Sequence, residues 1–252
     1  MKFNFKVQQY QTDAVEAVVR VFQGQPRSYG AEYMRDLGTS EYRYRRSGGR
    51  AAEYDKNQLD FQEELDSAGF RNEEIFLTDE QLLDNIRTLQ AEGNIRLSDG
   101  LVAPFGRCAL DVEMETGTGK TYVYIKTIFE LNRRYGWSKF IVVVPSIAIR
   151  EGVNKTFEMT AEHFMEHYSR KARFFVYDSA NLQKLDEFSS NSGISVMIIN
   201  TQAFAKSMNE QKNVEGQGGD KAARIIYTKR DEFGSRRPID VIAANRPIVI
   251  LD

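Results

Sequence analysis

The amino-acid sequence predicts an α/β fold in which a mostly parallel sheet is flanked by helices. Two observations support this prediction. Apolar runs such as residues 139–145 and 247–252 are continuous rather than alternating, which is typical of strands buried on both faces. Segments with the apolar spacing of helices lie between those runs, and strands that alternate with helices favour a doubly wound parallel sheet.

The composition limits the class of protein. Of the 252 residues, 41% are hydrophobic and 28% are charged, as in a soluble globular protein. No apolar run approaches the roughly 20 residues that cross a bilayer. The first residues are too polar for a secretory signal, so we expect a cytoplasmic protein without membrane contact. The single cysteine, Cys108, excludes an internal disulfide, and its apolar surroundings predict a buried thiol.

The net charge of −2 excludes a protein that coats nucleic acid by charge alone, because such proteins are strongly basic. Any contact with nucleic acid must therefore be local, through a groove or through backbone amides at helix starts.

Residues 1–26 form the first part of the chain. Apolar residues at helical spacing predict an amphipathic helix over residues 7–22. Thr12 or Asp13 could cap this helix, and the Gly-Gln-Pro stretch at residues 24–26 ends it.

Residues 27–106 are expected to be an inserted irregular and helical segment. Periodicity fails over residues 27–77, where tyrosines and arginines are interleaved. This stretch is either a basic, aromatic loop that contacts nucleic acid or a solvated insertion whose arginines pair with nearby acidic residues, which we favour. A capping box at residues 78–81 then opens a helix that ends near residue 91, and residues 95–102 suggest a short hairpin.

Residues 107–252 are expected to form one α/β lobe. The predicted strands cover residues 108–112, 139–145, 173–177, 194–199 and 247–252, and the predicted helices cover residues 121–134 and 151–170. A polar loop over residues 207–238 would hold one short element at residues 222–227.

The most informative stretch is residues 114–121, Met-Glu-Thr-Gly-Thr-Gly-Lys-Thr. It lies between a predicted strand and a predicted helix, which is the setting of a phosphate-binding loop. Gly117 and Gly119 can adopt the backbone angles that point successive amides into one concavity, and the helix start adds its positive dipole end.

The side chains of this loop suggest nucleotide chemistry. Lys120 would reach the β- and γ-phosphates, and the Thr121 hydroxyl would hold a bridging Mg²⁺. Thr116 and Thr118 are small spacers that let the loop close. Met114 stands where the strict motif has glycine. The alternative is a glycine-rich turn with an incidental lysine.

Asp252 ends the last apolar strand. In such folds the carboxylate that orients magnesium lies at the carboxyl end of a strand near the phosphate loop, and we assign that role to Asp252. The alternative is a surface aspartate at the end of a core strand. Because no second carboxylate follows it, we expect the sequence to be a piece of a longer protein that turns over little nucleotide by itself.

Two weaker patterns are interpreted as solvated surface. His163 and His167 lie one helical turn apart, but the sequence offers no third metal ligand. The charged stretch at residues 229–237 is interpreted as a solvated loop rather than a DNA contact.

The order of these motifs resembles the first RecA-like motor domain of superfamily 2 helicases and translocases. Within that group, residues 114–124 and 145–153 resemble the restriction (Res) subunit of type III restriction-modification enzymes. The motifs that carry the resemblance to superfamily 2 are Tyr10-Gln11 and residues 116–121, 144–146, 200–204 and 250–252.

The resemblance implies further roles. Gln11 would read the adenine edge, and Tyr10 would pack near the base. Four residues at strand ends and helix starts would contact DNA phosphates without reading sequence. These are Pro145, Ser146, Thr201 and Gln202.

The resemblance also implies a function, which is ATP-driven movement on double-stranded DNA before cleavage, with ATP and Mg²⁺ as cofactors. A methyltransferase (modification) subunit would be the partner that recognises the site. Alternatives are the ATPase lobe of another superfamily 2 repair or RNA helicase, and a nucleotide-binding scaffold module without catalysis.

Overall fold

A computed structural model describes residues 6–28, 30–38, 67–103, 106–203 and 226–252. The chain divides into two compact units. Unit 1 comprises residues 1–29, 73–137 and 156–170, and unit 2 comprises residues 30–72, 138–155 and 171–252. Each unit is described by itself below.

Unit 1 is helical. Helix α1 (Gln9–Arg20) lies against helix α5 (Lys120–Tyr135), and polar contacts tie the two helices along their length. The Lys126 ammonium donates to the Thr12 hydroxyl at 3.0 Å, and the Tyr135 hydroxyl donates to the Val19 carbonyl at 2.8 Å. The rings of Phe22 and Trp137 pack edge to face beyond these contacts, 5.0 Å apart. α1 is therefore a rigid neighbour of α5.

The capping box at the start of helix α4 (Asp79–Glu92) is confirmed. Thr78 accepts from the Gln81 backbone amide, and the Gln81 side chain accepts from the Thr78 amide. The predicted hairpin over residues 95–102 is wrong, because no strand forms there. The Gln90 side chain instead hydrogen-bonds both the backbone amide and the hydroxyl of Ser98, so the helix itself holds the loop.

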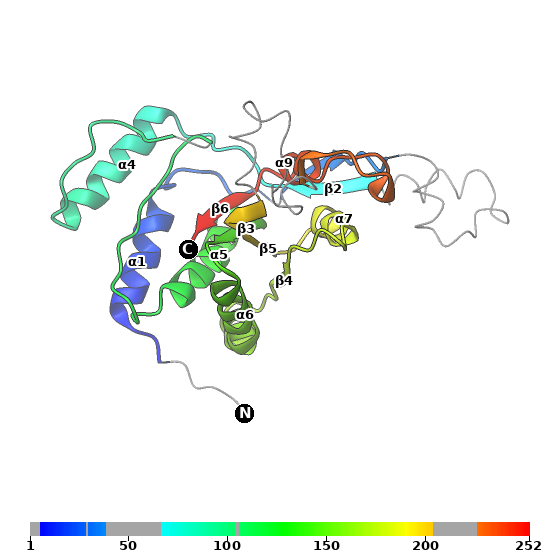
Figure 1. Ribbon diagram of the computed structural model, residues 1–252. Coiled ribbons are helices and arrows are strands. Elements are labelled where there is room, and N and C mark those ends of the chain that lie inside the picture. The colour runs from blue at the N-terminus through cyan, green and yellow to red at the C-terminus, as the bar shows by residue number, and fades with distance from the viewer. Residues whose placement is uncertain (1–5, 29, 39–66, 104–105, 204–225) are drawn as a thin grey trace, which may run out of the picture. The chain divides into compact units, whose positions relative to one another are not determined.

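Unit 2 contains a four-stranded sheet in the order β4-β5-β3-β6, and the neighbouring strands are all parallel. The labels in Figure 1 mark these strands. Their bounds are β3 (Lys139–Val144), β4 (Arg173–Val176), β5 (Ser195–Asn200) and β6 (Ile248–Leu251). The predicted parallel sheet is confirmed. β3 is buried along its whole length, as expected of a central strand.

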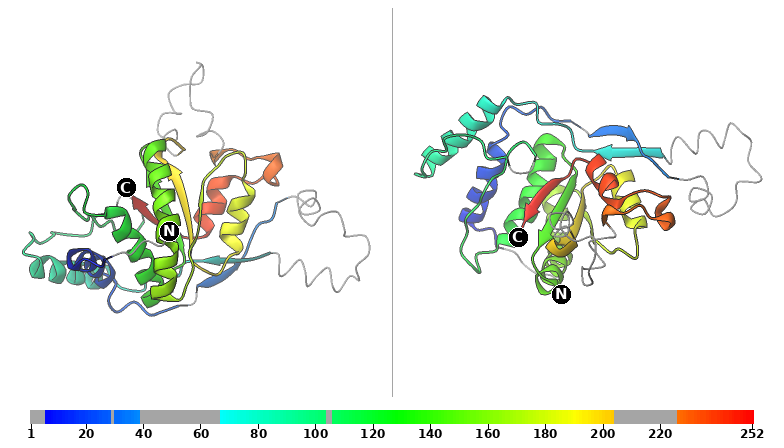
Figure 2. Two further views of the ribbon diagram at one scale, coloured as in Figure 1. Left: turned by 90° about the horizontal axis from the view of Figure 1, so that it is seen from below. Right: turned by 45° about the horizontal axis from the view of Figure 1, so that its top comes forward.

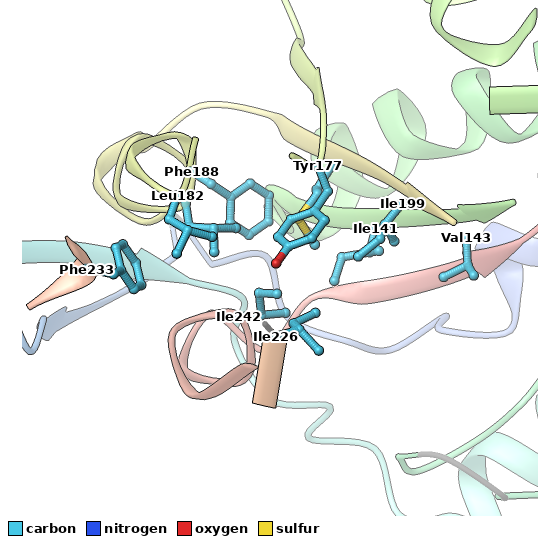
Figure 3. Packing of buried hydrophobic residues seen from close by; sticks show 11 residues of the cluster. Ile141, Val143, Tyr177, Leu182, Phe188, Ile199, Ile226, Phe233 and Ile242 are labelled. Carbon is cyan, nitrogen blue, oxygen red and sulfur yellow. The ribbon is translucent and has the colours of Figure 1, made fainter. Parts of the chain in front are cut away.

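One hydrophobic cluster packs helices α7 (Gln183–Ser190) and α9 (Pro238–Ala244) onto a face of this sheet, as Figure 3 shows. Strand residues such as Ile141 and Ile199 meet Phe188 of α7 and Ile242 of α9. Tyr177 also belongs to this cluster, where burial raises the pKa of its hydroxyl to about 12. The sequence had predicted neither helix.

A second, antiparallel pair of strands lies within the region that was predicted to be irregular. β1 (Ala31–Met34) pairs with β2 (Ala68–Arg71), and the right-hand view of Figure 2 shows them side by side in blue and cyan. Part of the region is therefore ordered. The arginines and tyrosines at residues 42–50 lie outside the described residues, as do the glycine-rich stretch at residues 216–219 and most of the element expected at residues 222–227.

The strand expected at residues 108–112 does not form, and these residues are exposed or half-buried. An apolar run becomes a strand only where a neighbour completes its hydrogen-bond ladder. Cys108 is likewise half-buried rather than fully buried, and this partial burial raises its pKa. β6 is also less buried than predicted, because Val249 and Leu251 remain 55% and 74% exposed.

Two helix starts differ from prediction. α1 begins at Gln9, and neither Thr12 nor Asp13 caps it. Helix α6 (Ile147–Tyr168) begins before residue 151 and runs through both units. Among the described residues, no helix combines the length and apolar character needed to cross a membrane.

Candidate functional site

The predicted phosphate-binding loop has the backbone conformation that its glycines were expected to supply. Gly117 and Gly119 have φ angles of 84° and 87°. These values lie in the left-handed region, which glycine enters at little cost. The Thr118 hydroxyl donates to the Glu115 carbonyl at 2.7 Å and closes the turn. The loop is therefore pre-shaped by its own residues.

Helix α5 begins at Lys120, directly after the loop, with Gly119 at its N-cap. The first amides of a helix and its dipole favour an anion at this position. The Lys120 side chain is exposed, and its ammonium donates to the Met114 carbonyl at 3.3 Å. Met114 thus contributes a backbone oxygen where the strict motif has glycine. Thr121 follows in the first turn of α5, half-buried.

Both residues of the Tyr10-Gln11 pair contact this loop. The Gln11 side-chain amide donates to the Thr118 carbonyl at 2.9 Å, and the Tyr10 hydroxyl donates to the same oxygen at 3.1 Å. Gln11 is buried and Tyr10 is half exposed. The resemblance implied that both residues lie near an adenine, and the structure adds a direct contact with the backbone of the phosphate loop.

The first turn of α5 also carries Tyr122, whose side chain contacts a histidine. The Tyr122 hydroxyl lies 3.0 Å from Nε2 of His163, and burial lowers the pKa of that imidazole. The Tyr122 ring also stacks on Phe164. His163 is therefore partly packed rather than fully solvated, whereas His167 is exposed. Within the described residues, no group of three or more histidine, cysteine or acidic side chains could hold a metal.

In unit 2 the register of the sheet brings the predicted DNA-contacting residues to one edge. Val144 of β3 lies opposite Asn200 of β5. The segments that follow these strands, residues 145–146 and 201–202, therefore leave the same carboxyl edge of the sheet side by side. This edge is where open α/β sheets bind ligands. All four residues, Pro145, Ser146, Thr201 and Gln202, are exposed.

Ser146 also starts helix α6. Its hydroxyl accepts from the Ile149 backbone amide at 3.3 Å, and its carbonyl accepts from the Arg150 amide at 3.0 Å. The start of a 22-residue helix thus lies at the exposed edge of the sheet. Thr201 and Gln202 begin the short helical turn η1 (Thr201–Ala203) after β5. Hydroxyls and amides at such positions suit phosphate oxygens.

Asp252 lies at the same edge, beside β3. Its backbone amide donates to the Val143 carbonyl at 3.0 Å and continues the pairing of β6 with β3. The Asp252 side chain is exposed, and Figure 1 marks this carboxyl end of the chain beside β6. The structure therefore places this carboxylate at the end of a parallel strand, as the sequence predicted.

Sequence reasoning named Asn200 only as part of the motif at residues 200–204 and gave it no role at this edge. The Asn200 side-chain oxygen is buried and has no hydrogen-bond partner among the described residues. Its position directly before Thr201 was the available signal, since polar residues at the carboxyl ends of parallel strands commonly line sites.

Comparison with known proteins identifies the family. Residues 4–227 match the family model described as "Type III restriction enzyme, res subunit". The chain is 34% identical to the EcoP15I Res subunit of Escherichia coli over 197 residues, or 72% of the chain. It is 30% identical to the EcoPI Res subunit of Escherichia phage P1 over 194 residues, again 72% of the chain. A Salmonella typhimurium relative, the StyLTI Res subunit, is 30% identical over 57% of the chain.

The chain is much shorter than these relatives. The matched regions span 19% of the EcoP15I subunit, 19% of the EcoPI subunit and 15% of the StyLTI subunit. The matched family and the four-stranded parallel sheet together identify a RecA-like helicase domain. This chain belongs to the family of type III restriction enzyme Res subunits.

Proposed function

We propose that this chain is the ATP-binding motor portion of a type III restriction endonuclease. In this proposal, ATP hydrolysis drives translocation on DNA, or a switch in state, before the DNA is cut. The observation that carries the proposal is the phosphate-binding loop at the start of α5, with Gly117 and Gly119 in left-handed conformations and Lys120 exposed. It occurs in a chain of the Res family.

The residues of this loop fit a nucleotide with a divalent cation. Main-chain amides of residues 116–121 would hold phosphate oxygens, and the Lys120 ammonium would neutralise the terminal phosphates. The Thr121 hydroxyl and the Asp252 carboxylate offer the hard oxygen ligands that Mg²⁺ prefers. When bound, Mg²⁺ would lower the charge on the phosphoryl group that is transferred. Gln11 would select adenine through its amide.

DNA contact is assigned to the carboxyl edge of the sheet in unit 2. Pro145, Ser146, Thr201 and Gln202 are exposed there, and their groups bind backbone phosphate without base specificity. This suits a protein that moves along double-stranded DNA. The selection of a target sequence then falls to a partner, for which the modification subunit of the same system is the candidate. The printed names of the relatives describe restriction-modification enzymes, which supports that choice.

Two other functions remain as alternatives. The chain could serve another superfamily 2 helicase, for repair or for RNA, but the relatives named above are all Res subunits. A scaffold that binds nucleotide without turnover would keep the same loop. DNA dependence of hydrolysis distinguishes a motor from such a scaffold.

The test is ATP hydrolysis by the full-length Res protein with its modification subunit, in the presence and absence of double-stranded DNA. We expect DNA-stimulated hydrolysis that Lys120→Ala abolishes. Lys171→Ala serves as a control, because it removes an exposed lysine that is not part of the loop. Nucleotide binding without hydrolysis on any nucleic acid would support the scaffold instead. Stimulation by RNA alone would support the RNA helicase.

A further inference from the structure

Tyr10 has a contact that the family resemblance does not assign. Its hydroxyl and the Gln11 amide donate to a single acceptor, the Thr118 carbonyl, at 3.1 Å and 2.9 Å. We propose that Tyr10 is a positioning residue for the phosphate-binding loop, which sets the direction of one loop amide whichever nucleotide is bound. The two side chains and the carbonyl are called the Thr118 clamp below. This inference rests on the proposed nucleotide-binding function.

The geometry of the peptide unit explains how the clamp would act. The Thr118 carbonyl and the Gly119 amide belong to one planar trans peptide, so they point in opposite directions. Two donors from α1 hold the carbonyl toward that helix, and the Gly119 N–H therefore points away from it. Gly119 is the N-cap of α5, and its amide is among the groups available to an anion at this helix start.

The donors can set this direction because their own helix is fixed. α1 is tied to α5 through Thr12 and Lys126, through an ion pair of Glu16 with Arg134, and through Val19 and Tyr135. Tyr10 and Gln11 thus project from a support that does not move independently of the loop. A hydrogen bond from such a support orients its acceptor better than one from a mobile side chain.

The two donors are not equivalent. By the proposed function Gln11 also meets the adenine edge, so its amide has two possible acceptors and can leave the Thr118 carbonyl when a base is bound. The Tyr10 hydroxyl has no assigned contact with the base. We therefore expect Tyr10 to affect every ligand with a phosphate chain, and Gln11 to affect chiefly those that carry adenine.

Binding affinities for three probes separate these roles. The full-length protein would be titrated with ATP, GTP and inorganic tripolyphosphate, the last having no base. For Tyr10→Phe we expect all three affinities to fall by the same factor, about two- to tenfold, which is the usual effect of one hydrogen bond. For Gln11→Ala we expect ATP to lose more affinity than tripolyphosphate, so that the preference for ATP over GTP falls.

Thr12→Val is the matched control. Thr12 lies on the same helix as Tyr10, and its replacement breaks the contact with Lys126 of α5 but leaves the Thr118 clamp and the other two ties between the helices intact. We expect the affinities of Thr12→Val for the three probes to equal those of the wild type. We also expect the thermal unfolding midpoint of Tyr10→Phe to be no lower than that of Thr12→Val.

Three results would overturn the inference. In the first, Tyr10→Phe leaves tripolyphosphate affinity unchanged. In the second, it weakens ATP alone, which would make Tyr10 a base contact. In the third, Thr12→Val weakens all probes equally, which would show a general effect of loosening α1. A wild-type protein that binds none of the probes would instead refute the proposed function, and this inference with it.

Discussion

Asp186 and Arg236 form a two-pronged ion pair inside unit 2. Nη1 and Nη2 of Arg236 lie 2.9 Å and 3.0 Å from the two carboxylate oxygens of Asp186, and both side chains are almost fully buried. Arg35 adds a second cation, 3.8 Å from Asp186. The same arginine donates to the Ala68 carbonyl, so this cluster fastens the β1–β2 pair to α7.

We expect Asp186→Asn to destabilise the protein by about 3–5 kcal/mol, because it leaves two buried guanidinium groups without their carboxylate. Asp240→Asn is the matched control, since Asp240 also pairs with an arginine, Arg237, but at an exposed site. Exposed pairs contribute little, so this change should stay within about 1 kcal/mol. Chemical denaturation of both variants measures the two losses. Equal losses of unfolding free energy in the two variants would show that the burial of the Asp186–Arg236 pair does not affect its contribution to stability.

The burial of Lys139 leads us to expect that the stability of the protein depends on pH. The Lys139 side chain is fully buried and donates to the carbonyls of Phe188 and Asn191 at the end of α7, and among the described residues it forms no ion pair with a carboxylate. Burial, and then the charge of Arg35, lower its pKa from 10.5 to about 7. The unfolded chain therefore binds more protons than the native state between those two values. Stability should rise with pH across that window, by up to about 1.4 kcal/mol per pH unit.

The measurement compares denaturation of the wild type at about pH 7.5 and about pH 9 with that of Lys139→Met. The methionine cannot titrate, so its stability should rise less over this interval. It also leaves the Phe188 and Asn191 carbonyls without their donor, which lowers the stability of the variant at every pH. Lys171→Met, at an exposed position, should keep the wild-type slope. A wild-type slope retained in Lys139→Met would assign the effect to other groups.

Local chemistry was the part of this fold that the sequence could predict. The capping box at Thr78, the glycine loop before α5 and the continuous apolar run of β3 each depend on neighbours within a few residues. For the same reason, residues at the carboxyl edge of the sheet, such as Ser146 and Thr201, were placed correctly relative to the strands that precede them.

Features that depend on distant partners were missed or misjudged. β1 and β2 are each 4 residues long and pair Met34 with Ala68, so neither carries a periodic signal of its own. Arg236 lies in a stretch interpreted as solvated, but it is buried, and its ion pair is with Asp186, 50 residues away. The apolar run at residues 108–112 was misjudged in the opposite direction, because the described chain gives it no neighbouring strand.

Gly136 should tolerate no side chain. It ends α5 with a φ of 81°, and a Cβ atom would lie 1.5 Å from the Ser28 carbonyl oxygen. Backbone must move to relieve such a contact, so we expect Gly136→Ala to cost more than about 2 kcal/mol. Gly152 is the contrast, since it lies within α6 and its Cβ would meet nothing within 4 Å. Gly152→Ala should stabilise the helix by about 0.5–1 kcal/mol.

Denaturation midpoints of these two variants, measured under one set of conditions, test the pair. We expect Gly136→Ala to lower the midpoint and Gly152→Ala to raise it. Destabilisation by Gly152→Ala would mean that this glycine serves a contact of its own, and a neutral Gly136→Ala would mean that Ser28 can move away without cost.

The last prediction concerns how Gln11 and Gly119 share space. A Cβ atom on Gly119 would lie 2.7 Å from Nε2 of Gln11, whereas one on Gly117 would meet nothing within 4 Å. Both glycines have positive φ, so alanine strains the backbone equally at either position. Only Gly119→Ala also displaces the Gln11 amide, because the end of a flexible side chain moves before the backbone does. Its hydrogen bond to Thr118 is then lost.

A double-mutant cycle isolates that loss. Gln11→Ala should cost about 0.5–1.5 kcal/mol of unfolding free energy in the wild type and in Gly117→Ala, since the hydrogen bond is intact in both. In Gly119→Ala the bond is already broken, and Gln11→Ala should then cost little. The cycle reports the contact without any nucleotide, so its result does not depend on the proposed activity. If Gln11→Ala costs as much in Gly119→Ala as in Gly117→Ala, Gln11 stabilises α1 by packing, and the hydrogen bond to the loop contributes nothing measurable.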